Sequence, residues 1–301
     1  MAVTPDLPSV TFAKAPLRSA IKHFYLLKAD TDGSLLPQVV NAGFSALDLP
    51  HQLSVFQVDS GELIEEMARQ PGIAGGIIDL ELSGHLVGEA EYVNEVVEEI
   101  GCANVVTKDE FSDLHVDNTY HTALTQLILQ HMANTQVVGG LVLGSTAIGR
   151  TAAHALEQLG IAVNIWDLSG DGSGDLSGVD FSNVSIVISG LASTSNFPSM
   201  PDLALRADTL VIETIVSGGI DTPLEAQAKV AKCALVAGVE LELEAVLLAF
   251  QALVSPIGLP RLVSVPEKAM AQALLAAVGE RCGEEVSNSV AEEWVQLKRK
   301  L

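Results

Sequence analysis

Two glycines near the middle of the chain have the spacing of a turn that binds a dinucleotide. In the stretch L-V-L-G-S-T-A-I-G-R-T-A-A, Gly144 follows an apolar run and Gly149 opens a helical pattern, at the outer positions of G-x-G-x-x-G. Thr146 holds the central position, where a glycine normally lets the backbone approach a pyrophosphate. We expect its side chain to obstruct the usual pose, although the free amides of the helix start still favour an anion.

An aspartate follows this turn at the distance expected of a ribose-binding residue. Asp167 lies 23 residues beyond Gly144, where a carboxylate can accept hydrogen bonds from both adenosine ribose hydroxyls and would repel a 2′-phosphate. The polar loop 169–178 adds two more acids and no Lys or Arg, so NAD is favoured and NADP is less favoured. The alternative is a structural turn followed by a solvated acid. The predicted cofactor-binding residues are Gly144, Ser145, Thr146, Ala147, Ile148, Gly149, Asp167 and Ser189.

Alternating strands and helices must position these residues. Apolar runs predict strands, and helical spacing predicts the segments between them. In chain order we expect strand 24–28, helix 37–47, strand 53–58, helix 60–70, strand 76–82, helix 89–100, strand 103–106, helix 119–134, strand 137–144, helix 148–159, strands 162–166, 184–188 and 209–213, helices in 225–253 broken near Gly238, and a helix at 290–301. The fold class is therefore α/β with parallel sheets covered by helices.

Composition and charge exclude several classes of protein. The chain has 301 residues, 48% of them apolar, which is enough for two domains and excludes disorder. Lys+Arg 16 against Asp+Glu 38 gives a net charge of −22, so nucleic acid and anionic membranes are poor partners. The three cysteines lack C-x-x-C spacing, so neither a disulfide framework nor a thiolate metal site is predicted. Together with the lack of a secretory h-region, this favours a cytoplasmic location.

Several short motifs resemble those of the shikimate/quinate dehydrogenase family, from about Phe24 to about Phe250. The family patterns S-x-S-P-x-x-H-N, G-A-x-N-T and D-N-T-D correspond here to S-L-L-P-Q-V-V-N, G-C-A-N-V and D-N-T-Y. The resemblance implies a substrate-binding α/β domain at 1–120 and a Rossmann-like NAD-binding domain at 121–240, with helices from about 240 to 301 packing back on the first domain. It also implies four ligand-orienting residues, namely Ser34, Asn104, Asn118 and Thr119.

The catalytic residues of that family are not retained. The family carries a lysine at the end of N-V-T-x-P-x-K and an aspartate at the end of N-T-D; placed without gaps, Ser83 and Tyr120 occupy these positions, and Ala245 replaces a substrate-binding glutamine. Oxidation of an alcohol by a nicotinamide needs a base for the hydroxyl proton, which serine cannot supply unaided. Tyr120 could act beside a cation, and His85 and His121 are neighbouring substitutes. Alternatively, both histidines are surface or loop residues.

Asp79 and Glu81 alternate with apolar residues, so we expect both acids to project from one strand face towards the cleft. Two carboxylates there would disfavour a carboxylate substrate and would attract a cationic or amino ligand. The alternative is a solvated edge strand. Two acids fall short of a usual set of metal ligands, so no metal is proposed.

Three functions fit these observations, and whether the chain is an enzyme stays open. The first is an NAD-linked oxidoreductase acting on a small polar alcohol or amine between the domains. The second is a non-catalytic descendant that binds a nucleotide or metabolite. The third, a purely structural protein, is least favoured because polar groups follow the predicted strands. The expected partner is a small molecule, and a homodimer is left open.

Overall fold

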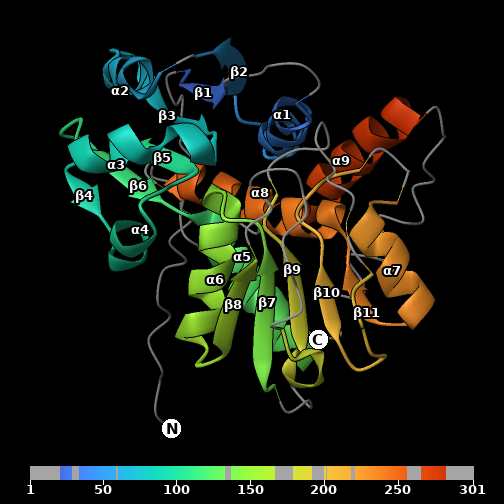
Figure 1. Ribbon diagram of the computed structural model, residues 1–301. Coiled ribbons are helices and arrows are strands. Elements are labelled where there is room, and N and C mark those ends of the chain that lie inside the picture. Colours follow the sequence, from blue (N-terminus) through green and yellow to red (C-terminus); the bar gives the residue numbers. More distant parts are fainter. Residues whose placement is uncertain are drawn as a thin grey trace, which may run out of the picture.

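Two sheets, each covered by helices on both faces, build the molecule (Figure 1). The computed structural model describes residues 21–28, 34–58, 60–132, 137–166, 179–191, 200, 202–217, 221–255 and 266–282. The predicted α/β fold class is confirmed. No helix among these residues is long and apolar enough to cross a bilayer.

The first sheet has the strand order β2-β1-β3-β5-β6-β4. Its strands are β1 (His23–Lys28), β2 (Gln52–Gln57), β3 (Ile73–Ile78), β4 (Tyr92–Val93), β5 (Val105–Lys108) and β6 (Leu114–Asp117). β5 runs antiparallel to both of its neighbours, whereas the other described pairs are parallel. The expectation of a parallel sheet is therefore wrong for β5. A short turn after β5 accounts for its antiparallel pairing with β6; in it Asp109 Oδ1 accepts hydrogen bonds from the backbone N–H groups of Phe111 and Asp113.

The first helix of this part of the chain has the predicted length, shifted by one residue, whereas the later ones are shorter than the sequence predicts. They are α1 (Leu36–Ala46), α2 (Gly61–Arg69), α3 (Gly84–Glu89) and α4 (Glu95–Ile100). The predicted helix 89–100 is confirmed only from Glu95 onward, because α3 ends at Glu89 and β4 precedes α4. Asn94 caps α4 by accepting a hydrogen bond from Val97 N at 2.8 Å. The predicted strand 76–82 is also too long, since a turn of 3-10 helix, η1 (Leu80–Leu82), follows Asp79.

Of the last two described helices, the first contacts β3 and β5 of this sheet, and the second packs on α1 and on the first. They are α8 (Gly238–Val254) and α9 (Glu267–Cys282). Phe24 of β1 stacks on Phe44 of α1 at 5.3 Å between ring centroids, and Phe44 contacts Phe250 of α8 at 5.2 Å. α2, α3 and α4 lie over the opposite face, where another apolar cluster is buried. The predicted helix at 290–301 lies outside the described residues, and the predicted domain boundaries stay a prediction.

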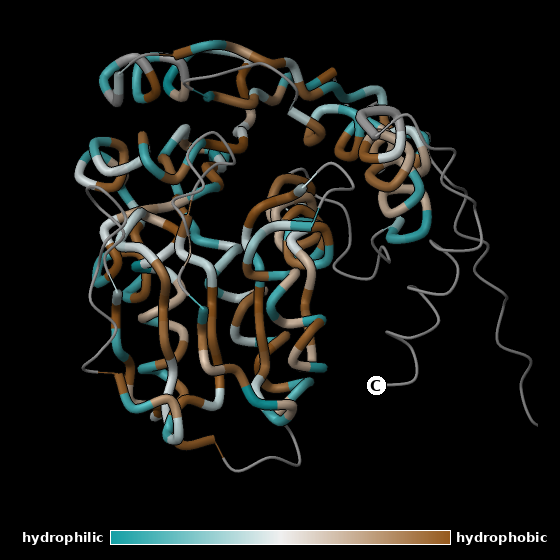
Figure 2. Tube along the Cα trace, turned by 45° about the vertical axis from the view of Figure 1, so that its right-hand side comes forward, coloured by the Kyte–Doolittle hydropathy of each residue, from teal (hydrophilic) through white to brown (hydrophobic). Residues whose placement is uncertain are grey.

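The second sheet is parallel throughout its described strands, in the order β11-β10-β9-β7-β8. Its strands are β7 (Gly139–Leu143), β8 (Ala162–Trp166), β9 (Ile186–Ser189), β10 (Leu210–Ile212) and β11 (Ala234–Val236). β7, β9 and β10 are buried along their whole length, and such strands of a parallel sheet are near-continuous apolar runs, which Figure 2 shows as hydrophobic segments. Helices α5 (Thr119–Met132) and α6 (Ala147–Gln158) contact one face.

The opposite face of this sheet packs against α7 (Pro223–Ala231) and residues near the 3-10 turn η3 (Phe181–Asn183). β11 separates α7 from α8, so the sequence missed a strand inside the helical pattern at 225–253. Lys232 ends α7 in a left-handed conformation. At the start of α8, a Cβ on Gly238 would lie 1.9 Å from the Ile215 carbonyl oxygen, so a glycine is required for this close approach.

Candidate active site

The loop after β7 lies at the point where the strand order of the second sheet reverses, which is where open α/β sheets bind ligands. Gly144 has φ 114°, and a Cβ on Gly149 would lie 2.3 Å from the Gly144 carbonyl oxygen. The two glycines thus let α6 pack closely on the loop. Thr146 Oγ1 donates a 2.6 Å hydrogen bond to the Gly190 carbonyl oxygen, which follows β9. Its side chain therefore bridges the two strand ends between which a dinucleotide would enter.

The amide that opens α6 is bonded to an acid from the other sheet's part of the chain. Ala147 N donates to Glu81 Oε1 at 2.7 Å. Beneath this contact, Ile100, Cys102 and Ala147 form a small buried apolar cluster. An anion does occupy the helix start, as the sequence predicts, but it is a carboxylate of the chain itself.

Asp79 and Glu81 do not project from one strand face, because the chain leaves the strand at Ile78. Asp79 Oδ1 instead accepts a hydrogen bond from Glu81 N at 3.1 Å and caps η1. The strand-face expectation is wrong for a local reason, namely this cap.

Ser83 is fully buried, and both bonds of its hydroxyl go to the backbone. Its Oγ donates to the Leu80 carbonyl oxygen and accepts from Ala103 N, each at 2.9 Å. The hydroxyl thereby fixes η1 against the segment before β5. This geometry gives Ser83 a positioning role and argues against proton transfer to a ligand.

The predicted ligand-binding asparagines and threonine bind one another and the backbone. Asn104 Oδ1 accepts from Thr119 N at 2.7 Å, and Asn104 Nδ2 donates to Thr119 Oγ1 at 2.8 Å. Thr119 Oγ1 donates in turn to the Ala245 carbonyl oxygen of α8 at 3.0 Å. Asn118 Nδ2 donates to Thr151 Oγ1 of α6 at 3.1 Å. All three side chains are buried and tie α5 to α6 and α8.

Tyr120 meets an acid that the sequence analysis missed. Its hydroxyl donates a 2.5 Å hydrogen bond to Glu242 Oε2 of α8. β1, β3 and β6 run in the same direction, so Lys28, Asp79 and Tyr120 lie at one edge of the first sheet. A signal for Glu242 was its position near the start of a late helix, but only folding brings residues 120 and 242 together.

Burial shifts both partners of this pair in the same direction. Burial raises the pKa of Tyr120 well above its usual range, and the negative charges of Glu242 and Asp79 raise it further. Burial also raises the pKa of the Glu242 carboxyl, against the opposing effects of the Tyr120 hydrogen bond and the Lys28 charge. The phenol therefore keeps its proton at neutral pH, and the carboxylate beside it is more basic than an exposed one.

The two candidate histidines lie in different places. His85 is exposed, and its Nε2 lies 3.2 Å from Glu65 Oε2 of α2. His121 is buried, with its Nε2 3.1 Å from His154 Nδ1 of α6, and His154 Nε2 lies 2.6 Å from Glu99 Oε2 of α4. Neither histidine is bonded to Tyr120 in the described structure.

The other predicted site residues have different surroundings, and one of them falls outside the described residues. Asp167 lies outside the described residues, so the structure says nothing of the ribose-binding prediction. Ser145 is exposed, Ile148 is buried in the apolar core, and Ser34 is partly buried just before α1. Ser189 Oγ at the end of β9 is buried and has no hydrogen-bond partner among the described residues.

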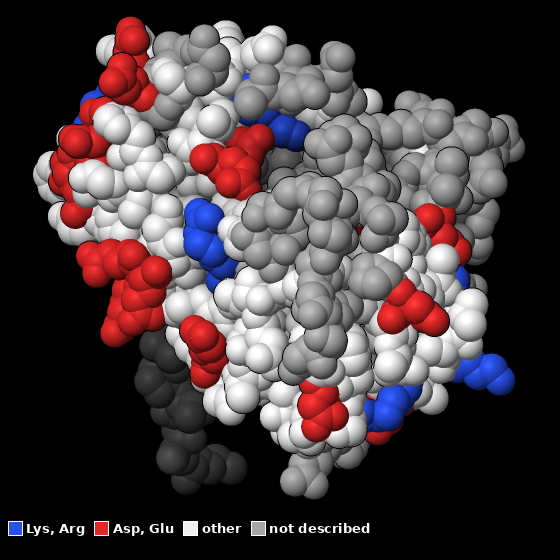
Figure 3. All heavy atoms as spheres, in the orientation of Figure 1, with Lys and Arg blue, Asp and Glu red and all other residues white. Residues whose placement is uncertain are grey.

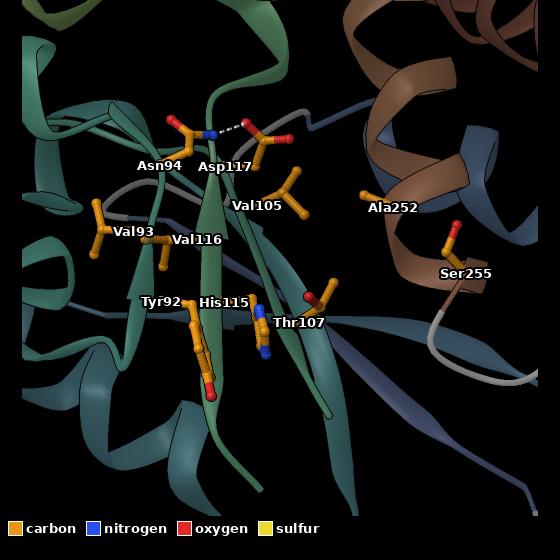
Figure 4. A pocket seen from close by; sticks show the side chains of 10 residues that line it. All are labelled: Tyr92, Val93, Asn94, Val105, Thr107, His115, Val116, Asp117, Ala252 and Ser255. Atoms are coloured by element: carbon orange, nitrogen blue, oxygen red, sulfur yellow. Dashed lines mark hydrogen bonds between the residues drawn. The ribbon is translucent and has the colours of Figure 1, made fainter. Parts of the chain in front are cut away.

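An acidic surface region and a cavity lie in the part of the molecule built on the first sheet. Figure 3 shows acidic side chains over the region of α2, α3 and α4, in keeping with the net charge of −22. A cavity of about 440 Å³ lies between β4, β5, β6 and the end of α8 (Figure 4), where Tyr92 and His115 stack at 4.2 Å. It contains Asp117, but neither Tyr120 nor Glu242 lines it.

Comparisons with known proteins define the class of fold. Shikimate dehydrogenase from Aquifex aeolicus is similar over 84% of this chain and 97% of its own, with a TM-score of 0.71 and 17% sequence identity. Quinate dehydrogenase from Corynebacterium glutamicum, solved with NAD, matches 85% of this chain and 99% of its own, with a TM-score of 0.68 and 18% identity. Shikimate dehydrogenase from Thermus thermophilus, solved with NADP(H) and shikimate, gives a TM-score of 0.68 at 17% identity, over 85% and 99% of the two chains.

Sequence relatives point the same way. The pentafunctional AROM polypeptide of Clavispora lusitaniae is 30% identical over 145 residues, which is 46% of this chain and 9% of that polypeptide. The corresponding polypeptide of Scheffersomyces stipitis is 26% identical over 187 residues, 52% of this chain and 12% of its own. The chain thus spans about a tenth of the length of these curated relatives. No family model matches the chain.

The chain has the two-sheet fold of the shikimate and quinate dehydrogenases. The resemblance predicted from its short motifs is therefore confirmed.

Proposed function

We propose that the chain is an NAD-linked oxidoreductase that acts on a small polar alcohol or amine between its two sheets. The observation that carries this proposal is the Tyr120–Glu242 pair, a proton donor and a basic acceptor 2.5 Å apart at an edge of the first sheet. Lys28 and Asp79 extend the polar edge. The pair would take the place of the lysine and aspartate that the resemblance leads one to expect.

The proposed proton path runs through both side chains. A bound dinucleotide supplies the hydride acceptor. As hydride leaves the substrate carbon, the substrate hydroxyl gives its proton to the Tyr120 oxygen, and the Tyr120 proton passes to the Glu242 carboxylate. The phenol then keeps a proton throughout, which suits its raised pKa, and one proton ends on Glu242.

Charge at this edge supports an uncharged or cationic substrate. Asp79 and Glu242 contribute two acids against one lysine, Lys28, so a carboxylate substrate would meet repulsion. We therefore expect negligible turnover of shikimate and quinate. The preference for NAD over NADP rests on Asp167 and the acidic loop after it.

The test is a turnover assay with matched variants. Purified protein is incubated with NAD or NADP and a panel of small polyols, amino alcohols, shikimate and quinate, while absorbance of the reduced nicotinamide is followed. Tyr120→Phe and Glu242→Gln should each lower kcat by about 10²-fold or more, as loss of acid–base catalysis does. The control variant is Tyr25→Phe, which removes one tyrosine hydroxyl from the aromatic pair of Tyr25 and Phe56. Full activity in the Tyr120→Phe protein would exclude this proton path.

A second candidate is a non-catalytic protein that binds a nucleotide or metabolite. It is favoured by the bridging of the strand ends by Thr146 and Gly190, and by the internal bonding of Asn104, Asn118 and Thr119. Calorimetric binding of NAD with no turnover across the panel would support it. A cytoplasmic location and a homodimer stay predictions from the sequence.

A further inference from the structure

We propose that Glu81 is an internal competitor of the dinucleotide, so that its carboxylate must leave the start of α6 before the phosphates bind. This inference rests on the proposed dinucleotide binding. Its basis is the 2.7 Å hydrogen bond from Ala147 N to Glu81 Oε1, between two parts of the chain that belong to different sheets.

The competition follows from the chemistry of one helix start. The first amides of a helix have no partner within the helix, and its dipole favours one negative group there. A pyrophosphate and the Glu81 carboxylate are both anions, and the Ala147 N–H points to only one acceptor. Like charges at hydrogen-bonding distance repel, so the bound phosphate and the Glu81 contact exclude each other.

The chain holds Glu81 at this place by several bonds. Asp79 Oδ1 accepts from Glu81 N, and Ser83 Oγ joins the Leu80 carbonyl oxygen to Ala103 N. The turn η1 is therefore fixed on both sides of Glu81. The carboxylate is presented by an ordered turn, and withdrawing it requires η1 and α6 to separate or the Glu81 side chain to rotate.

Independent observations at the same edge also point to a ligand. Leu143, at the end of β7, pairs with Trp166 of β8 and with Ser189 of β9. Trp166 Nε1 and Ser189 Oγ are buried and without a hydrogen-bond partner among the described residues. Buried polar atoms normally have partners, so these two atoms at the ends of β8 and β9 are candidate hydrogen-bonding groups for a ligand.

The experiment compares dinucleotide affinity in matched variants of the full chain. NAD and NADP are titrated calorimetrically into the wild type, Glu81→Ala, Glu81→Gln and Glu110→Gln. Glu110 is exposed in the turn after β5, so its variant controls for the loss of one negative charge. We expect Glu81→Ala to bind about tenfold more tightly, the factor for loss of one charged competitor. Glu81→Gln should gain less, because its amide oxygen still accepts from Ala147 N.

Hydrogen exchange of the Ala147 amide in the absence of nucleotide gives a second readout. The amide should exchange faster in Glu81→Ala than in the wild type, and unchanged exchange would overturn the contact. If wild type and both Glu81 variants bind NAD equally, the inference is wrong while dinucleotide binding stands. If none of the proteins binds either dinucleotide, both proposals fall. Should Glu81→Ala not fold, Glu81→Gln decides by the same two measurements.

Discussion

Replacing Ser83 by alanine separates a positioning role from a catalytic one. The Ser83 side chain is wholly buried, and its loss leaves Ala103 N, itself fully buried, without its acceptor. An unsatisfied buried donor costs about 1–3 kcal/mol, so we expect a loss of about 2 kcal/mol in the free energy of unfolding. With a urea slope of about 3 kcal/mol/M, the unfolding midpoint should fall by about 0.7 M.

A variant of an exposed serine is the control for the Ser83→Ala protein. Ser45 is exposed on α1, and Ser45→Ala should stay within about 0.5 kcal/mol of the wild type. Urea titrations followed by circular dichroism measure the three proteins side by side. If Ser83→Ala unfolds at the same midpoint as Ser45→Ala, the two buried hydrogen bonds do not stabilise the protein. If stability is unchanged while turnover is lost, the hydroxyl takes part in the chemistry after all.

Three further outcomes follow from the structure. Gly149→Ala should cost about 1–3 kcal/mol of stability in thermal unfolding, because its Cβ would clash with the Gly144 carbonyl oxygen at 2.3 Å. Burial and the neighbouring His154 imidazole lower the pKa of His121, so the folded state binds fewer protons than the unfolded state near pH 6.5. The urea midpoint should therefore fall as the pH drops from about 6.5. The midpoint of a His121→Asn protein should fall less over the same pH range. The double change Ser83→Lys with Tyr120→Asp should unfold the protein or lower its stability by several kcal/mol rather than create a dehydrogenase. The reason is that Ser83 is fully buried, so the new ammonium would be buried too. Circular dichroism measures this loss of folded structure.

Local patterns predicted most elements and the turn between β7 and α6. The apolar run before Gly144 and the helical spacing after Gly149 placed β7 and α6 within a few residues, because period and glycine spacing are properties of the nearby sequence. The expected interference of Thr146 with a dinucleotide stays a prediction, and the structure adds that its hydroxyl donates to the Gly190 carbonyl oxygen. Short strands such as β4, two residues long, carry too little pattern to be seen.

The contacts that define the candidate site were beyond the reach of local patterns. Glu242 reaches Tyr120 only because α8 crosses the first sheet, 122 residues further along the chain. Apolar alternation continues through residue 82 and predicts a strand at Glu81. In the structure the Asp79 side chain caps a turn of 3-10 helix there instead. Side-chain caps and long-range pairs depend on geometry that residue spacing does not encode.

The core of the first sheet combines residues from an early and a late part of the sequence. This arrangement affects the order in which the two sheets fold during synthesis on the ribosome. Phe24 and Phe44 emerge well before Phe250 and Met270, which complete their packing. The second sheet is made from one continuous stretch, 139–236, whose contacts close over shorter loops and therefore with less entropic cost. The nascent chain should thus form its second sheet first, while the earlier strands of the first sheet wait for α8 and α9 and need protection from aggregation until these are synthesised.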